Sequence, residues 1–270
     1  MRDIKANELK GCNFIRSITL SHGLTEIGES AFHDCRNLET VVIPETVTKI
    51  GPLAFARSGL KSITLLDGWL TEIREGTFRW CSKLENVIIP KTVTKIGFYA
   101  FAHCYRLKSI TLPHGLTDIG KEAFFACRNL ENIVIPETVT KIGAEAFALS
   151  GLKSITLPHG LTEIEREAFN YCRKLETIVI PESVTKIGFN AFIFSGLKSI
   201  TLPHGLIEIR EFAFYNCVDL ETVVIPETVT KIGFRAFAAS GLKTIILPYG
   251  VKIGEDVFLN CNNLVVEYRK

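Results

Sequence analysis

Apolar residues recur along the chain in short alternating runs, each closed by a proline or a glycine. Leu107, Ile110 and Leu112 form one such run, which ends at Pro113 and predicts a short strand and its stop. The run from Val139 to Gly143 alternates again and turns at its glycine, as a second short strand would. The Ala-Phe-x-x-Cys step that follows each second run predicts a tight helical turn.

These runs belong to one tandem repeat. The block LPHGLTEIxxxAFxxCxxLExI alternates with IPETVTKIGxxAFAxSGLKSI, so one coil has 22 or 23 residues. Leu9 and Cys12 stand where a further coil would have its aromatic residue and its cysteine. We interpret residues 1–17 as a partial repeat or cap, residues 18–264 as the repeat region and residues 265–270 as a tail. One phenylalanine per coil sets the register: Phe32, Phe55, Phe78, Phe101, Phe124, Phe147, Phe169, Phe192, Phe214, Phe237 and Phe258.

Each coil has one apolar edge that it cannot bury alone. Stacking the coils at the spacing of parallel strands, roughly 4.8 Å, joins these edges into one continuous core. The sequence therefore predicts a repeat solenoid, a leucine-rich-repeat-like right-handed coil of about eleven short parallel-strand repeats. Its length would be on the order of 50 Å.

The consensus LxxIxIPxxVxxIGxxAFxxCxxL resembles the BspA-like class of leucine-rich repeats over essentially residues 9 to 264. Members of that class are usually parts of bacterial or protist surface and secreted proteins that bind host or matrix proteins. The resemblance implies adhesion, a concave strand face and a secreted or cell-surface location, and it carries no catalytic residues. The opening MRDIKANELKGCNF lacks the apolar stretch of a secretory signal, which leaves the compartment open.

Charge and hydropathy narrow the class of partner. The net charge is +2, from 31 basic and 29 acidic residues, which argues against duplex DNA and anionic membrane surfaces. No run of 18 apolar residues occurs, so membrane insertion is not expected. We expect a protein or peptide partner that is recognised by shape and local chemistry.

Stacking turns repeated positions into columns of side chains. Two charge columns alternate in sign along nearly the whole chain, which favours one stacking register over a charged ligand track. The first is Arg16, Glu39, Lys61, Glu85, Lys108, Glu131, Lys153, Glu176, Lys198, Glu221 and Lys243. The second is Glu26, Lys49, Glu72, Lys95, Asp118, Lys141, Glu163, Lys186, Glu208 and Lys231.

Columns of histidine and cysteine do not predict a metal site or a disulfide framework. Histidines such as His159 and His204 recur every second coil, roughly 10 Å apart, which is too far to share a metal. We expect no metal and no cofactor. Seven of the eight cysteines share a column with serines such as Ser58, which favours buried free thiols.

Catalytic motifs are missing from the sequence. It contains no Gly-rich phosphate loop, no HExxH and no GxSxG. Isolated serines and histidines belong to repeated columns, whereas an active site needs one unique arrangement. The chain is therefore not expected to be an enzyme.

Binding residues should lie where the copies differ, because invariant columns are explained by packing. Aromatic residues gather at variable turn positions, as interface anchors do, although they could simply stack along the edge and cover the solenoid. These candidates are Trp69, Trp80, Phe98, Tyr99, Phe125, Tyr171, Phe189, Phe194, Phe212 and Tyr215. An inserted residue within residues 65–69 is expected to place Trp69 near Trp80.

The predicted strand face offers a second candidate surface. Val134, Val179 and Val224 lie between inward-facing residues and make this column apolar at every other coil. The alternative explanation is the ordinary preference of β-branched residues for strands.

The sequence thus favours a non-catalytic protein-binding scaffold, such as a ligand- or host-protein-binding repeat module. The alternatives are a structural, self-assembling module and the recognition part of a larger effector protein. The expected oligomeric state is a monomer or weak end-to-end self-association.

Overall fold

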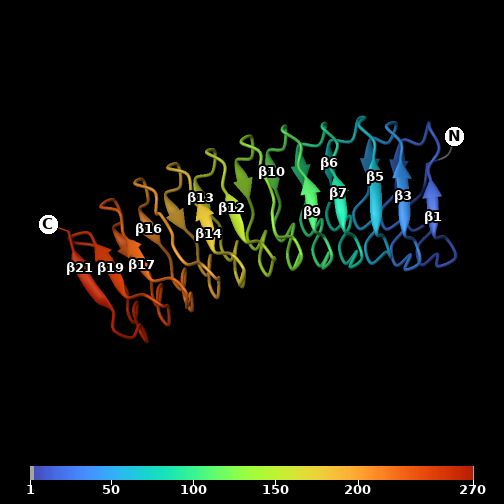
Figure 1. The fold of residues 1–270 in the computed structure, drawn as a ribbon. Helices are drawn as coiled ribbons and strands as arrows, with labels where there is room; N and C mark the ends of the chain where they lie inside the picture. The colour runs from blue at the N-terminus through green and yellow to red at the C-terminus, as the bar shows by residue number, and fades with distance from the viewer. Residues whose placement is uncertain (1–2, 270) are drawn as a thin grey trace.

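The computed structural model describes residues 3–269, which form one stack of parallel coils with the two termini at opposite ends (Figure 1). Most coils contribute a strand of three or four residues to one side, here the long-strand face. These strands are β1 (Ser17–Thr19), β3 (Thr40–Ile43), β5 (Ser62–Leu65), β7 (Asn86–Ile88), β9 (Ser109–Thr111), β12 (Ser154–Thr156), β14 (Thr177–Val179), β17 (Thr222–Val224), β19 (Thr244–Leu247) and β21 (Val265–Tyr268).

Two-residue strands form a second side, the short-strand face. They are β2 (Glu26–Ile27), β4 (Lys49–Ile50), β6 (Glu72–Ile73), β8 (Lys95–Ile96), β10 (Asp118–Ile119), β11 (Lys141–Ile142), β13 (Glu163–Ile164), β15 (Lys186–Ile187), β16 (Glu208–Ile209), β18 (Lys231–Ile232) and β20 (Lys252–Ile253). The segments between a short strand and the next long strand, which carry the Ala-Phe step, form the turn edge.

All paired strands are parallel and one coil apart. Thr40 of β3 faces Ser17 of β1 on one side and Ser62 of β5 on the other. Alternation along each strand sends every second side chain inward, as in β5, where Ile63 and Leu65 are buried and Ser62 and Thr64 are exposed. The predicted repeat solenoid of about eleven parallel-strand coils is confirmed.

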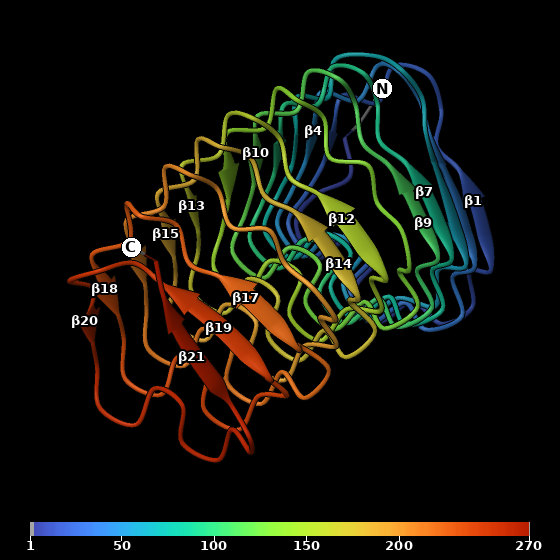
Figure 2. The same cartoon turned by 60° about the vertical axis from the view of Figure 1, so that its left-hand side comes forward.

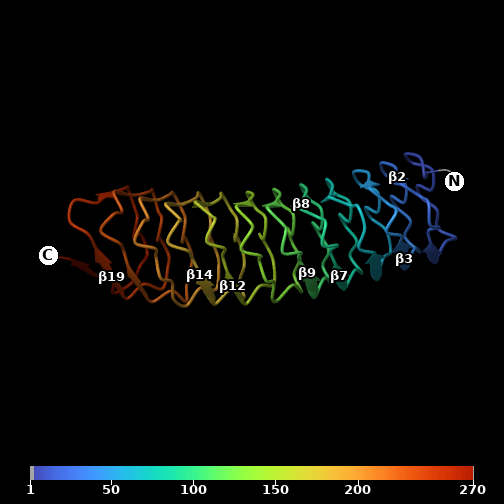
Figure 3. The same ribbon diagram turned by 90° about the horizontal axis from the view of Figure 1, so that it is seen from above.

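The stack is a gently bent and twisted rod. Strand direction rotates from β1 to β21 (Figures 1 and 2), and the view from above shows a shallow bend rather than a closed ring (Figure 3). Rotation between neighbouring strands follows from the right-handed twist of each strand. A rod of this shape presents its long-strand face along its whole length.

A ladder of phenylalanine rings runs through the core. Rings in neighbouring coils stack nearly parallel, with centroids 5.0 Å apart for Phe32 and Phe55 and 5.4 Å apart for Phe124 and Phe147. Phe124 is fully buried. Because each ring covers the next, the aromatic column that sets the register in the sequence is also the centre of the folded stack.

The turn after each short strand is not helical, so that expectation was wrong. Residues 3–269 contain no helix. The residue before Ala-Phe and the residue before Cys or Ser have left-handed backbone, as at Glu122 (φ 53°) and Ala126 (φ 57°). The Phe124 N–H donates to the Ala146 carbonyl of the next coil at 2.8 Å. Left-handed residues end a helix, and backbone groups bonded to neighbouring coils cannot form helical bonds.

Both end segments take part in the stack. Ile4 bridges to Ile27, and Leu9 packs against the core, as a partial repeat would. Residues 265–270, expected to be a tail, instead contain β21, which pairs with β19 from Val265 to Tyr268. The β-branched pair Val265 and Val266 suits a strand, and the Val265 N–H donates to the Lys243 carbonyl at 2.8 Å. Residues 1, 2 and 270 lie outside the described part.

Candidate binding surfaces

Apolar side chains project from the long-strand face at every other coil, where alternation turns them away from the core. Val134 is 84% exposed, Val179 58% and Val224 37%. Ile88 belongs to the same column and is 69% exposed. We call these four residues the apolar stripe. Thr111, Thr156 and Thr201 occupy the intervening coils and are also exposed.

Hollows accompany two members of the stripe. A hollow of about 320 Å³ is lined by Ile110, Val134 and Pro136 among others. A second, of about 660 Å³, is lined by Thr201, Val224 and neighbouring residues. Residues 132–135 and 199–202 are not assigned as strands, so the β-ladder is interrupted there. The apolar stripe therefore consists of exposed side chains with hollows next to two of them.

Ion pairs border the stripe and follow the predicted alternation. Lys153 lies 2.6 Å from Glu131, and Lys108 lies 2.7 Å from Glu85, one coil back in each case. Hydrogen bonding to Lys153 holds the pKa of the Glu131 carboxyl below its usual value. Because the lysines are engaged by carboxylates, this column offers no free cationic track.

Most aromatic candidates on the turn edge stack on one another. Trp80 stacks on His103 with ring centroids 3.8 Å apart, and Tyr171 stacks on Phe194 at 4.6 Å. Tyr215 meets Phe194 at 5.9 Å, edge to face. Tyr99, Phe125, Phe189 and Phe212 are likewise half-buried on this edge, whereas Phe98 is 56% exposed. The half-buried rings thus pack along the edge, and their role as binding residues stays a prediction.

Trp69 and Trp80 occupy different sides of the coil. Trp69 follows β5 in the turn toward the short-strand face and is 73% exposed, while Trp80 lies on the turn edge after β6. No ring contact joins them in residues 3–269, so the expected proximity was wrong. The inserted residue lengthens the turn between β5 and β6, but Trp69 in this turn does not reach the turn edge where Trp80 lies.

The contacts of the histidines and cysteines described next are ion pairs and hydrogen bonds between coils. His22 Nδ1 lies 3.0 Å from a Glu45 carboxylate oxygen at the surface. The Cys81 Sγ donates to the Phe55 carbonyl at 3.1 Å, and burial raises its thiol pKa to about 12. Cys172 resembles it, with burial raising the thiol pKa to about 11. A protonated, buried thiol is a poor nucleophile. In the described chain, no three His, Cys, Asp or Glu side chains are grouped for a metal ion.

The sequence prediction missed several residues on the turn edge. His103 is the stacking partner of Trp80, and Arg57, Gly59 and Lys83 border Trp80 in a notch described below. A signal existed for the notch, because coils that carry serine in the cysteine column are one residue shorter before the next leucine.

No helix in residues 3–269 has the length and hydropathy of a membrane span.

Comparisons with known proteins place this architecture in a family. A model of the BspA type leucine rich repeat region matches residues 2–124, 71–195 and 162–266. A leucine-rich repeat protein from Bacteroides ovatus is 30% identical, with a TM-score of 0.78, over 92% of this chain and 73% of that chain. A leucine rich cell surface protein from Faecalibacterium prausnitzii is 31% identical, with a TM-score of 0.61, over 99% of this chain and 83% of that chain.

More distant similarity concerns the fold alone. The pneumococcal vaccine antigen PcpA is 21% identical, with a TM-score of 0.64, and the match covers 99% of this chain and 82% of that chain. A search of curated proteins found no match. The family model covers nearly the whole sequence, and it agrees with the observed stack of parallel coils. The chain belongs to the BspA-type leucine-rich repeat family.

Proposed function

We propose that this protein is a non-catalytic scaffold that binds a protein or peptide along its long-strand face. The observation that carries the proposal is the apolar stripe, in which Val134 is 84% exposed beside a hollow of about 320 Å³. Exposed apolar side chains that line up over several coils are typical of a binding surface. The relative from Faecalibacterium prausnitzii is a cell surface protein, which supports an extracellular partner for this chain. A host or matrix protein is the kind of partner that the family resemblance implies.

The chain itself supplies the isosteric substitution that tests the stripe. Threonine occupies the same column at Thr111, Thr156 and Thr201, so it fits this strand geometry. We expect Val134→Thr, Val179→Thr and Val224→Thr, combined in one variant, to keep the melting temperature of the wild type. Loss of apolar burial at three sites should weaken binding to a purified matrix-protein panel by about tenfold or more, measured by surface plasmon resonance.

The reverse substitution provides a matched control. Thr156→Val fills the gap between Val134 and Val179 and should strengthen binding to the same protein of the panel. If the triple threonine variant binds as tightly as the wild type, or if no panel protein binds at all, the stripe is not the site proposed for these partners.

A further inference from the structure

Coils of two lengths alternate along much of the turn edge. Two residues separate Cys35 from Leu38, but only Gly59 separates Ser58 from Leu60. The Gly59 N–H donates to the Cys35 carbonyl at 3.1 Å, and a Cβ on Gly59 would lie 2.0 Å from the Arg36 carbonyl oxygen. A short coil without a side chain therefore lies between two longer neighbours, which leaves a notch.

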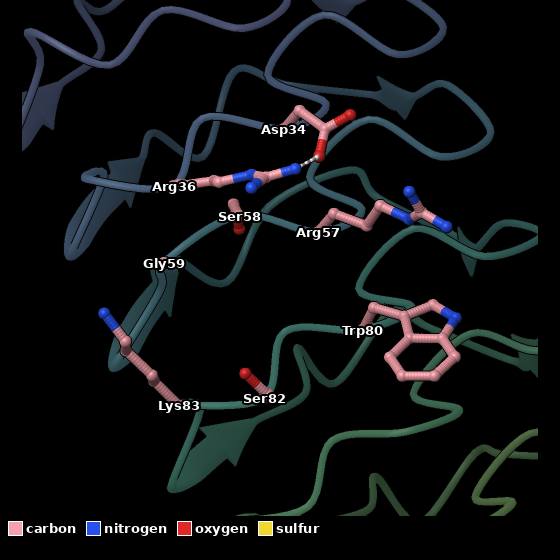
Figure 4. A pocket seen from close by; sticks show the side chains of 8 residues that line it. All are labelled: Asp34, Arg36, Arg57, Ser58, Gly59, Trp80, Ser82 and Lys83. Carbon is pink, nitrogen blue, oxygen red and sulfur yellow. Dashed lines mark hydrogen bonds and ion pairs between the residues drawn. The ribbon is translucent and has the colours of Figure 1, made fainter.

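This Gly59 notch is a hollow of about 450 Å³ with a cationic lining. Figure 4 shows its side chains: Asp34, Arg36, Arg57, Ser58, Gly59, Trp80, Ser82 and Lys83. The lining contains three cationic side chains, Arg36, Arg57 and Lys83, and one carboxylate, that of Asp34. Arg36 lies 3.5 Å from the Asp34 carboxylate. Arg57 and Lys83 are exposed, and no carboxylate of residues 3–269 lies within ion-pair distance of either side chain. Lys83 nevertheless lies near enough to Glu39 to help lower the pKa of that carboxyl. The notch thus holds one cation, Arg57, that has no carboxylate neighbour beside it, and a second, Lys83, that is shared with Glu39.

The indole of Trp80 lies on the same side of the notch as the Arg57 guanidinium (Figure 4). Arg57 and Trp80 occupy the same column in consecutive coils and project toward the same side of the notch (Figure 4). The indole of Trp80 stacks on His103 with ring centroids 3.8 Å apart, and the backbone N–H of Trp80 donates to the Ala102 carbonyl at 2.8 Å. A guanidinium beside a fixed ring can engage an oxyanion and an adjacent apolar group together.

The same combination recurs four coils further on, roughly 19 Å away at strand spacing. There a hollow of about 490 Å³, the Gly151 notch, is lined by Arg128, Arg173, Lys174 and Tyr171. Its cations are partly engaged: Lys174 lies 3.5 Å from Glu131, and the Arg173 guanidinium lies 5.6 Å from the Tyr171 ring centroid. The Gly59 notch is therefore the stronger candidate.

We propose that the Gly59 notch binds an oxyanionic side chain, carboxylate or phosphate, of a peptide segment whose neighbouring side chain packs on Trp80. This proposal rests on the proposed function, since it names the chemistry of a second contact with a protein partner. A peptide fits better than a polyanion, because the cationic groups of this edge gather in two separate notches and do not form a continuous track. Elsewhere lysines such as Lys61 pair with carboxylates, and the net charge is only +2.

Intrinsic fluorescence allows a direct test. The chain has two tryptophans, so a Trp69→Phe background leaves Trp80 as the reporter. The probes are three otherwise identical acetylated peptides: tyrosine flanked by glutamates, tyrosine flanked by glutamines, and phosphotyrosine flanked by glutamines. We expect saturable changes in Trp80 emission with an anionic probe and none with the neutral one. The two anionic probes distinguish a carboxylate ligand from a phosphate ligand.

Variants then locate the site. Arg57→Gln with Lys83→Gln should weaken binding of the anionic probe by about tenfold or more. Lys10→Gln with Lys252→Gln removes the same charge from exposed positions outside the notch and should leave binding unchanged. Circular dichroism confirms that both variants fold. The proposal would be overturned if neither anionic probe binds or if the neutral probe binds as tightly as they do. It would also be overturned if both double variants lose the same affinity.

The variant with threonine at the three valines of the stripe separates the two proposals. It retains the notch and should bind the anionic probe as the wild type does, whether or not it has lost affinity for a matrix protein. A failure of the stripe and a failure of the notch are therefore distinguishable.

Discussion

His103 carries a titratable ring into the stacked turn edge. Burial lowers the pKa of His103 below the ordinary histidine value of 6.5, and the positive charge of the neighbouring Arg79 lowers it further. The carboxylate of Glu122 acts in the opposite direction. Arg128 acts in the same direction as Arg79. The folded state thus favours the neutral ring that lies against Trp80. In the unfolded chain the ring takes up its proton at a higher pH.

We therefore predict that the contribution of His103 to stability falls as pH drops from about 7.5 to about 5.5. The unfolded chain binds the additional proton in this range, so the melting temperature should fall. Substitution by asparagine suits the left-handed backbone there (φ 63°) and removes the titration.

Thermal unfolding at several pH values measures this effect. His103→Asn loses the stack on Trp80 and should melt lower at pH 7.5, but with a smaller change between the two pH values. An unchanged pH dependence in the variant would assign the effect to other groups. The carboxylates of Glu39 and Glu85, whose pKa values are held below 4.5 by Lys61 and Lys108, titrate outside this window.

Single residues differed in how far the sequence predicted their role. The phenylalanine column was evident because every copy repeats it. The exposure of Val134 was evident too, because alternation along a strand fixes which side chains point outward. The His103–Trp80 stack was not, because the residue at this position differs from coil to coil, so no repeated pattern indicates which side chains lie face to face.

At the scale of the element, the short Ser-Gly turn depends on a glycine without a Cβ. Alanine at Gly59 would place a Cβ 2.0 Å from the Arg36 carbonyl oxygen, and backbone cannot move away as a flexible side chain can. Gly115 provides a contrast, since its nearest neighbour would be 3.8 Å from the added Cβ. Both glycines lie in turns, but the approach of the adjacent coil is close at Gly59.

We predict that Gly59→Ala lowers the free energy of unfolding by about 1–3 kcal/mol, as overpacking does. Gly115→Ala should be neutral or stabilise by up to about 1 kcal/mol through the unfolded state. Urea denaturation of the two variants measures both values. Equal effects would show that the close approach at Gly59 does not limit the turn.

The turn after the short strand is the element whose type the sequence did not reveal. Its residues include good helix formers such as Ala146 and Glu145, and local preference alone favours a helical turn. In the stack, Glu145 adopts φ 58° and its N–H donates to the Arg166 carbonyl of the next coil. Bonds between coils replace bonds within a helix, and those partners are defined only once the coils are stacked.

At the scale of the whole molecule, the alternating charge column links one coil to the next. Lys153 pairs with Glu131 at 2.6 Å, and the following coil presents Glu176 in the same column. Charge reversal at one coil places like charges beside both neighbours. Exchanging one pair would only move the repulsion to the adjoining coils, so the register is a property of the column.

We predict that Lys153→Glu lowers the melting temperature more than Lys153→Gln, because it adds repulsion to the loss of an ion pair. The difference should shrink between about 0.05 M and about 0.5 M NaCl, since exposed charges are screened. Adding Glu131→Lys to Lys153→Glu should restore only part of the loss, because residue 131 then faces Lys108. Full restoration would mean that the pair acts independently of its column.

The sequence by itself determined the repeat, its register, the buried phenylalanine column, the alternation of charge and the family, because identical positions in stacked coils must meet identical surroundings. Only the tertiary structure decided the left-handed turns, the addition of β21 to the sheet and the separation of Trp69 from Trp80. It also decided the Gly59 notch, which Arg57 and Trp80 line on one side and Lys83 on the other (Figure 4). These features depend on how closely one coil approaches the next, and that distance is set by packing between residues more than 20 positions apart.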